Sequence, residues 1–270
     1  MKTNTASFPV NNHGEMARFV LRPAQKTELP TIINLYNSGL SKTESALALN
    51  PKELKAHLRS DPEGIWLGFL EGRFAEPLTM VGIKKVACDK ASLPPTLEAL
   101  NLKETDLSGN FWVSTWAGVD LGRGEGWTGT YNQRDLNLGQ LTFAALTKLA
   151  QETKGKVDAI IDFARPKGLK TYLQKKGYDV RFTFTPGEVV INGRYMQHDK
   201  NGLFYIYGGK TIRVLDMQKY WIWGDDPIFY FHTANGAVFD PKLVFPKGDI
   251  RNQESLFFLV GFYYPVIKEE

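Results

Sequence analysis

The stretch from Thr128 to Gln140 combines turn-forming residues with the start of an amphipathic helix. Apolar residues recur at helical spacing from Leu138 to Leu149, so the helix is expected to begin near Asn137. The first N–H groups of a helix have no partner inside it, and the helix dipole adds partial positive charge there. This segment therefore predicts a site for a pyrophosphate. The residues expected to form it are Thr130, Gln133, Arg134, Asp135, Leu136, Asn137, Leu138, Gly139 and Gln140.

A second glycine-rich stretch, residues 123–129, lies just upstream and has a composition that also suits a phosphate loop. No helical periodicity follows it directly, so the dipole argument favours the downstream segment. Both stretches remain candidates. The alternative interpretation without any ligand is that 122–140 is a long connection capped at Asn137.

The segment from Asp226 to Ala237 contains a histidine in a predicted helix that opens with Asp226-Pro227 and stops at Asn235-Gly236. Because the intrinsic pKa of histidine lies near neutrality, His232 is a candidate general acid or base. Ile228, Phe231 and His232 share one helix face, so a structural histidine in the core is the competing interpretation.

The hexapeptide Arg134-Asp135-Leu136-Asn137-Leu138-Gly139 resembles the pyrophosphate loop of the GNAT superfamily of N-acetyltransferases, Arg/Gln-x-x-Gly-x-Gly/Ala. Arg134 and Gly139 match this pattern. Asn137 stands at the middle glycine and tolerates positive φ better than most residues, whereas Asp135 brings an anion where glycine is common. The stretch Arg18 to Ala24, followed by a capped helix, resembles the family's first strand and helix. The resemblance covers most of 17–170 and 220–265.

Two segments compete to be the last helix of the core. Residues 164–168 and 226–237 resemble a GNAT branch with Arg-x-Pro-Gly after the fifth strand, an insertion, and then Asp-Pro-x-x-x-Phe-His-x-x-x-Gly. Residues 168–178 resemble the family's Tyr-x-x-x-Gly-Phe signature, but Leu173 stands four residues before Gly177 and Tyr172 is one residue off. The first interpretation makes about 169–222 an insertion near the acceptor site.

The resemblance implies acetyl-CoA as a co-substrate, no metal, and direct attack of an acceptor amine on the thioester. A backbone N–H near Val119 or Thr130 would stabilise the oxyanion, and Glu125 or Tyr131 would help to deprotonate the amine. His232 would serve as acid or base. A small-molecule amine or a peptide is the expected acceptor.

A catalytically decayed GNAT-like module that binds a ligand or a partner is the alternative function. Asp135 and Asn137 would then mark the decayed loop. The aromatic residues that would form its binding surface are Phe204, Tyr205, Tyr207, Tyr220, Trp221 and Trp223.

The elements needed to position these residues follow the order β-α-α-β-β-β-α-β, then an insertion, then α-β. This order predicts an α/β fold around one sheet in which parallel and antiparallel pairs mix. The resemblance implies that this is a GNAT-like mixed, mostly antiparallel central sheet flanked by helices. Residues 1–15 are polar and show no hydrophobic pattern, so a flexible tail is expected there. Residues 16–270 are expected to form a single domain. The expected strands are 18–22, 65–71, 78–88, 111–119, 157–163 and 256–262. Hairpins are expected in 180–222, and a glycine-rich loop or hairpin turn at 122–126. The expected helices begin at Thr27, Ser41, Pro51, Asn137, Gly168 and Asp226.

Bulk composition excludes several classes of protein. The 270 residues carry a net charge of only +4, and no Lys/Arg run reaches five, so no nucleic-acid partner is expected. No apolar window is long enough to cross a membrane, and no signal peptide is visible, so a cytoplasmic location is expected. The single cysteine, Cys88, cannot form an internal disulfide, and the scattered histidines give no metal-ligand spacing. A homodimer is compatible with this interpretation.

Overall fold

The computed structural model describes residues 5–38, 50–89, 105–153, 157–183, 185, 187–246, 253 and 255–266. The chain forms two compact units. The first contains Met1–Cys88, Asn101–Ile161 and Tyr264–Glu270, and the second contains Asp89–Leu100 and Asp162–Tyr263. The sequence predicts one domain instead. The boundary falls inside β8 (Ala159–Ala164) and near the end of β16 (Phe258–Pro265), and an unbroken strand leaves no linker-like signal in the sequence.

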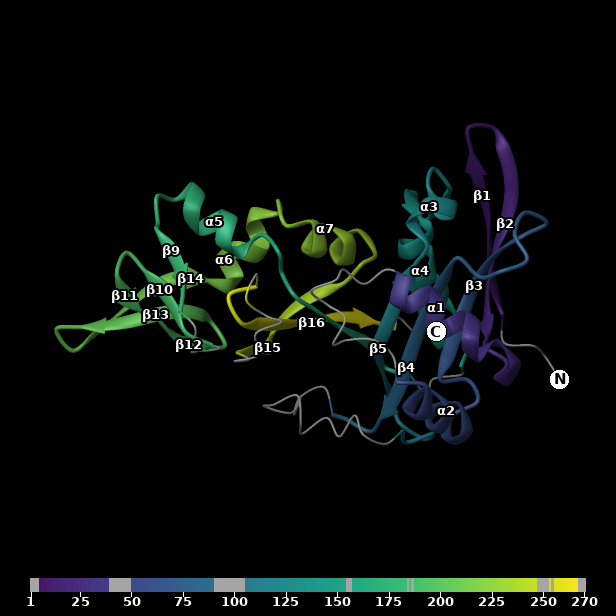
Figure 1. Ribbon diagram of the computed structural model, residues 1–270, viewed down its shortest axis with the longest axis horizontal. Helices are drawn as coiled ribbons and strands as arrows, with labels where there is room; N and C mark the ends of the chain where they lie inside the picture. Colours follow the sequence, from purple (N-terminus) through teal and green to yellow (C-terminus); the bar gives the residue numbers. More distant parts are fainter. Residues whose placement is uncertain are drawn as a thin grey trace. The chain divides into compact units, whose positions relative to one another are not determined.

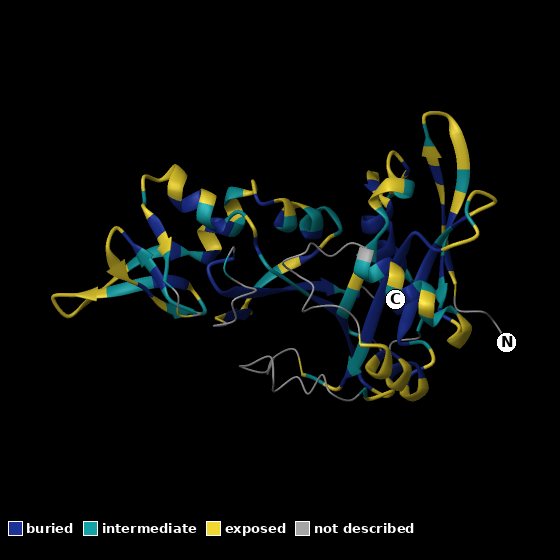
Figure 2. Ribbon diagram, viewed as in Figure 1, coloured by how far each residue is buried: buried dark blue, intermediate teal, exposed yellow. Residues whose placement is uncertain are grey.

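The first unit is built on an antiparallel sheet with the strand order β5-β4-β3-β2-β1-β6-β7. Consecutive residues of β3 and β4 are buried, so side chains on both faces of these strands lie in the core, and Figure 2 shows β3 and β4 buried along most of their length. The strands are β1 (Ala6–Asn12), β2 (Glu15–Pro23), β3 (Ile65–Glu71), β4 (Thr79–Val86), β5 (Phe111–Val119), β6 (Thr128–Tyr131) and β7 (Arg134–Asn137).

Helices cover both faces of this sheet. A short 3-10 helix, η1 (Lys26–Glu28), leads into α1 (Leu29–Ser38), and α1 and α2 (Pro51–Ser60) pack in one apolar cluster with Met80 of β4. The next residue back, Thr79, bonds to Thr142 of α4 (Leu138–Glu152) through their hydroxyl groups, 2.7 Å apart. Neighbouring strand residues point to opposite faces, so α4 covers the face opposite to α1 and α2.

The second unit holds helices and three groups of strands (Figure 1). Strand β15 (Val238–Pro246) pairs antiparallel with β16. Two three-stranded sheets are β11-β10-β9 and β12-β13-β14. Their strands are β9 (Val180–Phe182), β10 (Val189–Ile191), β11 (Arg194–Tyr195), β12 (Gln197–Asp199), β13 (Gly202–Tyr207) and β14 (Lys210–Asp216). The helices are α5 (Leu169–Lys175), α6 (Met217–Trp223) and α7 (Pro227–Ala234).

The expected α/β class and the mostly antiparallel sheet flanked by helices are confirmed. Strands 65–71 and 111–119 have the predicted bounds, and Asn137 caps α4 as expected. The segment proposed as an insertion, about 169–222, contains α5, both small sheets and nearly all of α6. Among the described residues, no helix is long and apolar enough to span a membrane.

Several expectations about local structure are wrong. The predicted flexible tail contains β1, where Phe8 and Val10 are buried and their neighbours are exposed, in register with β2. Residues 1–15 are polar in composition because the exposed residues of β1 alternate with the buried ones. Composition therefore does not reveal the two-residue period of this strand. The glycine-rich loop at 122–126 begins within a one-turn helix, α3 (Leu121–Gly124). Gln25, not Thr27, precedes the first helical turn, and α6 and β15 were not predicted. The helix expected at Ser41 lies outside the described residues, as does most of 89–109.

Candidate functional site

The segment predicted to be a pyrophosphate loop is largely a β-hairpin. Strands β6 and β7 pair from Thr128↔Asn137 to Tyr131↔Arg134. Asn132 and Gln133 form the turn with φ values of 48° and 61°. Positive φ at both central residues is the geometry of a type I′ hairpin turn. Residues 134–137 are thus extended strand and not a loop that wraps an anion. The physical reason is that an Asn-led turn closes the two short strands on each other.

The start of α4 is capped by its own side chains. Oδ1 of Asn137 accepts from the N–H of Gln140 at 3.0 Å, and Oε1 of Gln140 accepts from the N–H of Asn137 at 3.1 Å. This reciprocal pair is a capping box, with glutamine at the third helical position. Two of the N–H groups expected to be free for a phosphate are therefore already bonded. Gly139 and Leu138 beside them are buried.

The end of β5, the short helix α3 and the first turns of α4 do come together. Val119 pairs with Thr79, and Thr79 bonds to Thr142 of α4. A Cβ at Gly124 of α3 would lie 3.3 Å from Cδ1 of Leu138. We call this region the β5–α4 corner. It is the strand-end and helix-start junction that the sequence places around Val119.

The second candidate for the phosphate loop, residues 123–129, contains one arginine, and its guanidinium is already bonded to two carboxylates. Arg123 bonds to Asp120 through Nε at 2.8 Å and to Glu76 through Nη1 at 2.9 Å. The bond to Asp120 raises the pKa of Arg123, and the backbone and side-chain bonds from Arg123 lower the pKa of Asp120. Gly126 adopts φ +78°, and a Cβ there would lie 2.6 Å from Oδ1 of Asn12. This stretch is a tight turn held against β1.

Glu125 directly follows α3 of the corner, and Tyr131 ends β6. The Glu125 side chain is exposed, and its backbone carbonyl accepts from Nδ2 of Asn12 at 3.4 Å. Tyr131 is at the turn end of the hairpin, edge-on to Phe8 with ring centroids 5.5 Å apart. Burial raises the pKa of the Tyr131 phenol. Thr130 faces Asp135 across the hairpin, with their side-chain oxygens 2.9 Å apart. Arg134, Asp135 and Gln133 are exposed, and Leu136 is buried.

In the second unit His232 of α7 lies beside Asp162 of β8. Nε2 of His232 is 3.4 Å from Oδ2 of Asp162, and their side chains are 4% and 12% exposed. The imidazole stacks on Phe262 with ring centroids 3.9 Å apart. Burial lowers the pKa of His232 to about 3, so the ring is neutral at neutral pH. From the sequence, the pKa of His232 was expected to lie near its ordinary value. Burial in the folded protein, which a sequence does not display, lowers this pKa instead.

Both candidates for the last helix of the core exist as helices. On α5, the Tyr172 ring is buried and its hydroxyl accepts from Nζ of Lys176 at 2.6 Å. On α7, Asp226 caps the helix by accepting from the N–H groups of Ile228 and Phe229. Both helices lie within the second unit, so the choice between them stays open.

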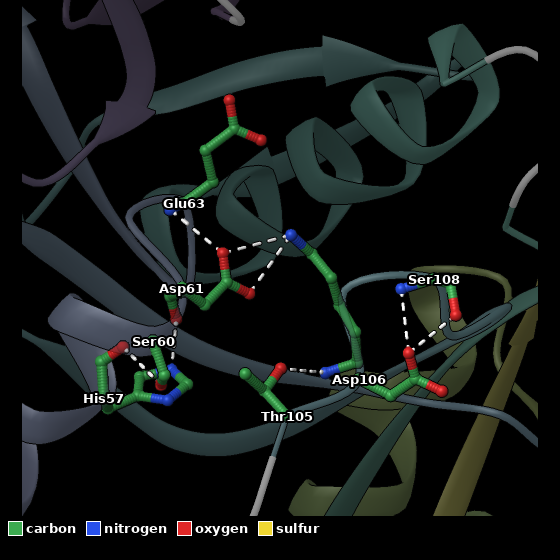
Figure 3. A network of polar contacts seen from close by, with 9 residues as sticks. His57, Ser60, Asp61, Glu63, Thr105, Asp106 and Ser108 are labelled. Carbon is green, nitrogen blue, oxygen red and sulfur yellow. Dashed lines mark hydrogen bonds and ion pairs between the residues drawn. The ribbon is translucent and has the colours of Figure 1, made fainter.

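A polar cluster that the sequence did not predict lies in the first unit (Figure 3). The Asp61 carboxylate is 2% exposed and 3.1 Å from Nζ of Lys85. It also accepts from the N–H of Glu63, while Nε2 of nearby His57 is 3.1 Å from the carbonyl of Gly64. Burial lowers the pKa of His57. A buried charge pair such as this is a structural tie, and no sequence signal links Asp61 to a lysine 24 residues later. Within the described ranges, no group of three or more His, Cys, Asp or Glu side chains could hold a metal ion.

Comparison with known proteins rests on structure. No protein-family model matches the sequence, and no curated protein matches it. A structure titled "GphF GNAT-like decarboxylase in complex with isobutyryl-CoA" matches 92% of this chain and 99% of its own, with TM-score 0.57 and 14% identity.

The chain has a GNAT-like fold.

Two further structures agree with this GNAT-like fold. The loading GNATL domain of CurA from Lyngbya majuscula matches 92% of this chain and 98% of its own, with TM-score 0.56 and 14% identity. Malonyl-CoA decarboxylase from Rhodopseudomonas palustris also matches 92% of this chain, but 60% of its own, with TM-score 0.54 and 14% identity. The resemblance seen in the sequence is thereby confirmed at the level of fold. At this identity, no residue role is transferred.

Proposed function

We propose that this chain is an enzyme that binds an acyl-CoA and acts on its acyl group. One observation carries the proposal: three solved GNAT-like structures match 92% of this chain, and two of their titles name an acyl-CoA. Two of these matches span 99% and 98% of the other chain, so nearly the whole of each of those chains shares this fold.

The first candidate reaction is acetyl transfer from acetyl-CoA to an amine. The amine nitrogen bonds to the thioester carbon, the C–S bond breaks, and the amine proton ends on the departing thiolate. Positioning and deprotonation of the amine supply most of the rate in such a direct attack. Val119 at the β5–α4 corner is the candidate for an oxyanion contact. The exposed position of Glu125 and the raised pKa of Tyr131 make both weak candidates for the base.

The second candidate reaction is decarboxylation of a malonyl-type acyl-CoA. Two of the three matched structures are titled as decarboxylases, one of them as a malonyl-CoA decarboxylase, which is the observation that favours it. In this reaction the bond between the α-carbon and the carboxylate breaks, CO₂ leaves, and the electron pair forms an enolate. A proton then adds to the α-carbon. Acyl-group chemistry of this kind requires stabilisation of a developing oxyanion, as amine attack does.

His232 suits oxyanion stabilisation better than proton transfer. With its pKa lowered to about 3, the imidazolium form is scarce at neutral pH and the ring is a weak base. A neutral imidazole N–H remains a hydrogen-bond donor to developing negative charge, as in the triosephosphate isomerase pattern. We therefore propose His232 as a neutral N–H donor whose ring is held by stacking on Phe262.

The deciding experiment measures thermal stability and product together. The melting temperature is recorded with acetyl-CoA, isobutyryl-CoA, malonyl-CoA, free CoA and ATP. A ligand at 100 times its Kd adds about 2.7 kcal/mol, which shifts the melting temperature by roughly 5–11 °C for a chain of this size. CO₂ release from malonyl-CoA would identify decarboxylation, and amine-dependent release of free thiol would identify acyl transfer. No shift with any acyl-CoA at millimolar concentration would overturn the proposal and favour the decayed binding module.

One variant pair tests the predicted phosphate segment. Arg134→Ala removes the exposed arginine at the start of β7, and Arg18→Ala removes an exposed arginine from β2 in the same sheet. If the pyrophosphate lies near residues 134–139, only Arg134→Ala weakens the thermal shift given by acetyl-CoA. Equal shifts in both variants would remove Arg134 from the proposed site.

A further inference from the structure

We propose that Asp226 and Tyr220 are positioning residues that hold His232 in place for the acyl-CoA chemistry. The expected effect on catalysis rests on the proposed function. The positioning of the His232 ring rests only on contacts within the second unit.

The Asp226 carboxylate joins three elements. Its Oδ1 accepts from the N–H groups of Ile228 at 2.8 Å and Phe229 at 3.2 Å, which caps α7. Its Oδ2 accepts from the N–H of Gly168 at 2.6 Å and from the Tyr220 hydroxyl of α6. Asp226 is 1% exposed, so all four donors reach a carboxylate that has almost no contact with water. We call this group the Asp226 cluster (Gly168, Tyr220, Asp226, Ile228 and Phe229).

Gly168 fits this cluster because it has no side chain. A Cβ at this position would lie 2.6 Å from the Tyr220 hydroxyl oxygen and 2.9 Å from Oδ2 of Asp226. Both distances are shorter than normal contacts, so any larger residue would push the carboxylate or the phenol away. A helix cap alone does not require a glycine 58 residues earlier in the chain. The close approach therefore points to a tie between the loop after β8 and α7.

This tie bears on both partners of the His232 contact. Asp162 lies six residues before Gly168 on the chain, and His232 lies six residues after Asp226. Fixing Gly168 against Asp226 therefore limits how far β8 and α7 can move apart. The 3.4 Å contact between His232 and Asp162 depends on that separation.

A row of aromatic rings makes a second connection between Tyr220 and His232. The Tyr220 ring contacts Phe229 with centroids 5.2 Å apart, and Phe229 contacts Phe262 at the same distance. Phe262 then stacks on His232. Edge-to-face and offset contacts of this kind hold rings in defined orientations. Tyr220 thus reaches His232 through the Asp226 cluster and through the ring row.

Two variants separate these connections from simple loss of stability. Tyr220→Phe keeps the ring and removes the hydroxyl donor to Asp226. Asp226→Ser keeps a good helix-capping residue but is too short to accept from both Gly168 and Tyr220. The matched controls are Tyr178→Phe, a half-buried tyrosine that follows α5, and Asp216→Ser, the residue that caps α6.

The readouts are ring signals of the histidines and steady-state kinetics. The chain has only four histidines, so ¹H–¹⁵N spectra can resolve each imidazole. In Tyr220→Phe and Asp226→Ser we expect the His232 signals to move while those of His57 and His198 stay in place. We also expect kcat to fall, by up to about a hundredfold for a displacement near 1 Å, with KM for the acyl-CoA unchanged. The control variants should change neither.

The outcomes for the two proposals are distinguishable. Unmoved His232 signals in both test variants, or an equal fall in kcat in the controls, would overturn the positioning role. Failure of the proposed function would appear already in the wild-type protein, as absence of a thermal shift with any acyl-CoA. The imidazole spectra would still show whether Asp226 and Tyr220 hold His232.

Discussion

Two buried histidines, His57 and His232, and the half-buried His198 make the stability of this protein depend on pH. Burial lowers the pKa of His57, His198 and His232, the last to about 3. In the unfolded chain each histidine returns to a pKa near 6.5. Below that pH the unfolded state binds protons that the folded state does not accept. Stability is therefore retained above about pH 6.5 and decreases as the pH falls.

The His232 contribution can be isolated with His232→Gln, which keeps a polar group beside Asp162. One proton taken up on unfolding costs about 1.4 kcal/mol per pH unit. Between about pH 6 and pH 4, the free energy of unfolding of the wild-type protein should fall more steeply than that of the variant, by about this amount per unit. Urea unfolding at a series of pH values measures both slopes. Parallel slopes would mean that the imidazole is already exposed to protons in the folded protein.

At the level of single elements, the capping box of α4 competes with any anion at the helix start. Asn137 and Gln140 bond to each other's N–H groups, and the β6–β7 hairpin delivers Asn137 to this position. An acyl-CoA phosphate bound here must share or displace these bonds. The alternative is that α4 needs no ligand at its start and the hairpin only positions the helix.

Asn137→Ala tests the strength of this cap. Loss of an N-cap asparagine costs about 0.5–2 kcal/mol. Asn50→Ala is the matched control because Asn50 caps α2 by accepting from the N–H of Lys52. We expect a similar loss of stability in both variants by urea unfolding. If the α4 start also binds the pyrophosphate, only Asn137→Ala changes the thermal shift with acetyl-CoA. A negligible loss for Asn137→Ala would contradict the capping box.

At the level of the whole molecule, β1 has a role that a flexible tail would not have. It pairs with β2 over seven residue pairs and meets β6 at Asn11↔Thr128. In the strand order of the first unit it therefore lies between β2 and the β6–β7 hairpin that leads into α4. Removing β1 would detach the hairpin from the rest of the sheet and leave the buried residues Phe19 and Leu21 of β2 without their paired strand.

Deletion of residues 1–12 should therefore lower the melting temperature strongly or prevent soluble expression. Deletion of residues 1–4, which precede β1, is the control and should leave the melting temperature nearly unchanged. Calorimetry on both truncated chains measures the difference. Equal stability of the two would restore the flexible-tail interpretation.

The sequence by itself determined the elements whose signals are local. Strict apolar patterns gave β3 and β5, a capping asparagine gave the start of α4, and Asp226-Pro227 gave the start of α7. These signals depend on neighbours within a few residues, which a sequence displays directly. Their order along the chain predicted an α/β fold around one sheet, and the motif resemblance at 134–139 added the GNAT-like fold.

Only the tertiary structure decided which groups are buried, bonded or brought together. The neutral state of His232, the bonds that occupy the start of α4 and the four donors to Asp226 all depend on residues distant in the sequence or on desolvation. The tie between Gly168 and Asp226 spans 58 residues, and the pair Asp61–Lys85 spans 24. Local pattern cannot reveal such contacts, because burial and pairing are set by how the elements pack and not by the order of residues.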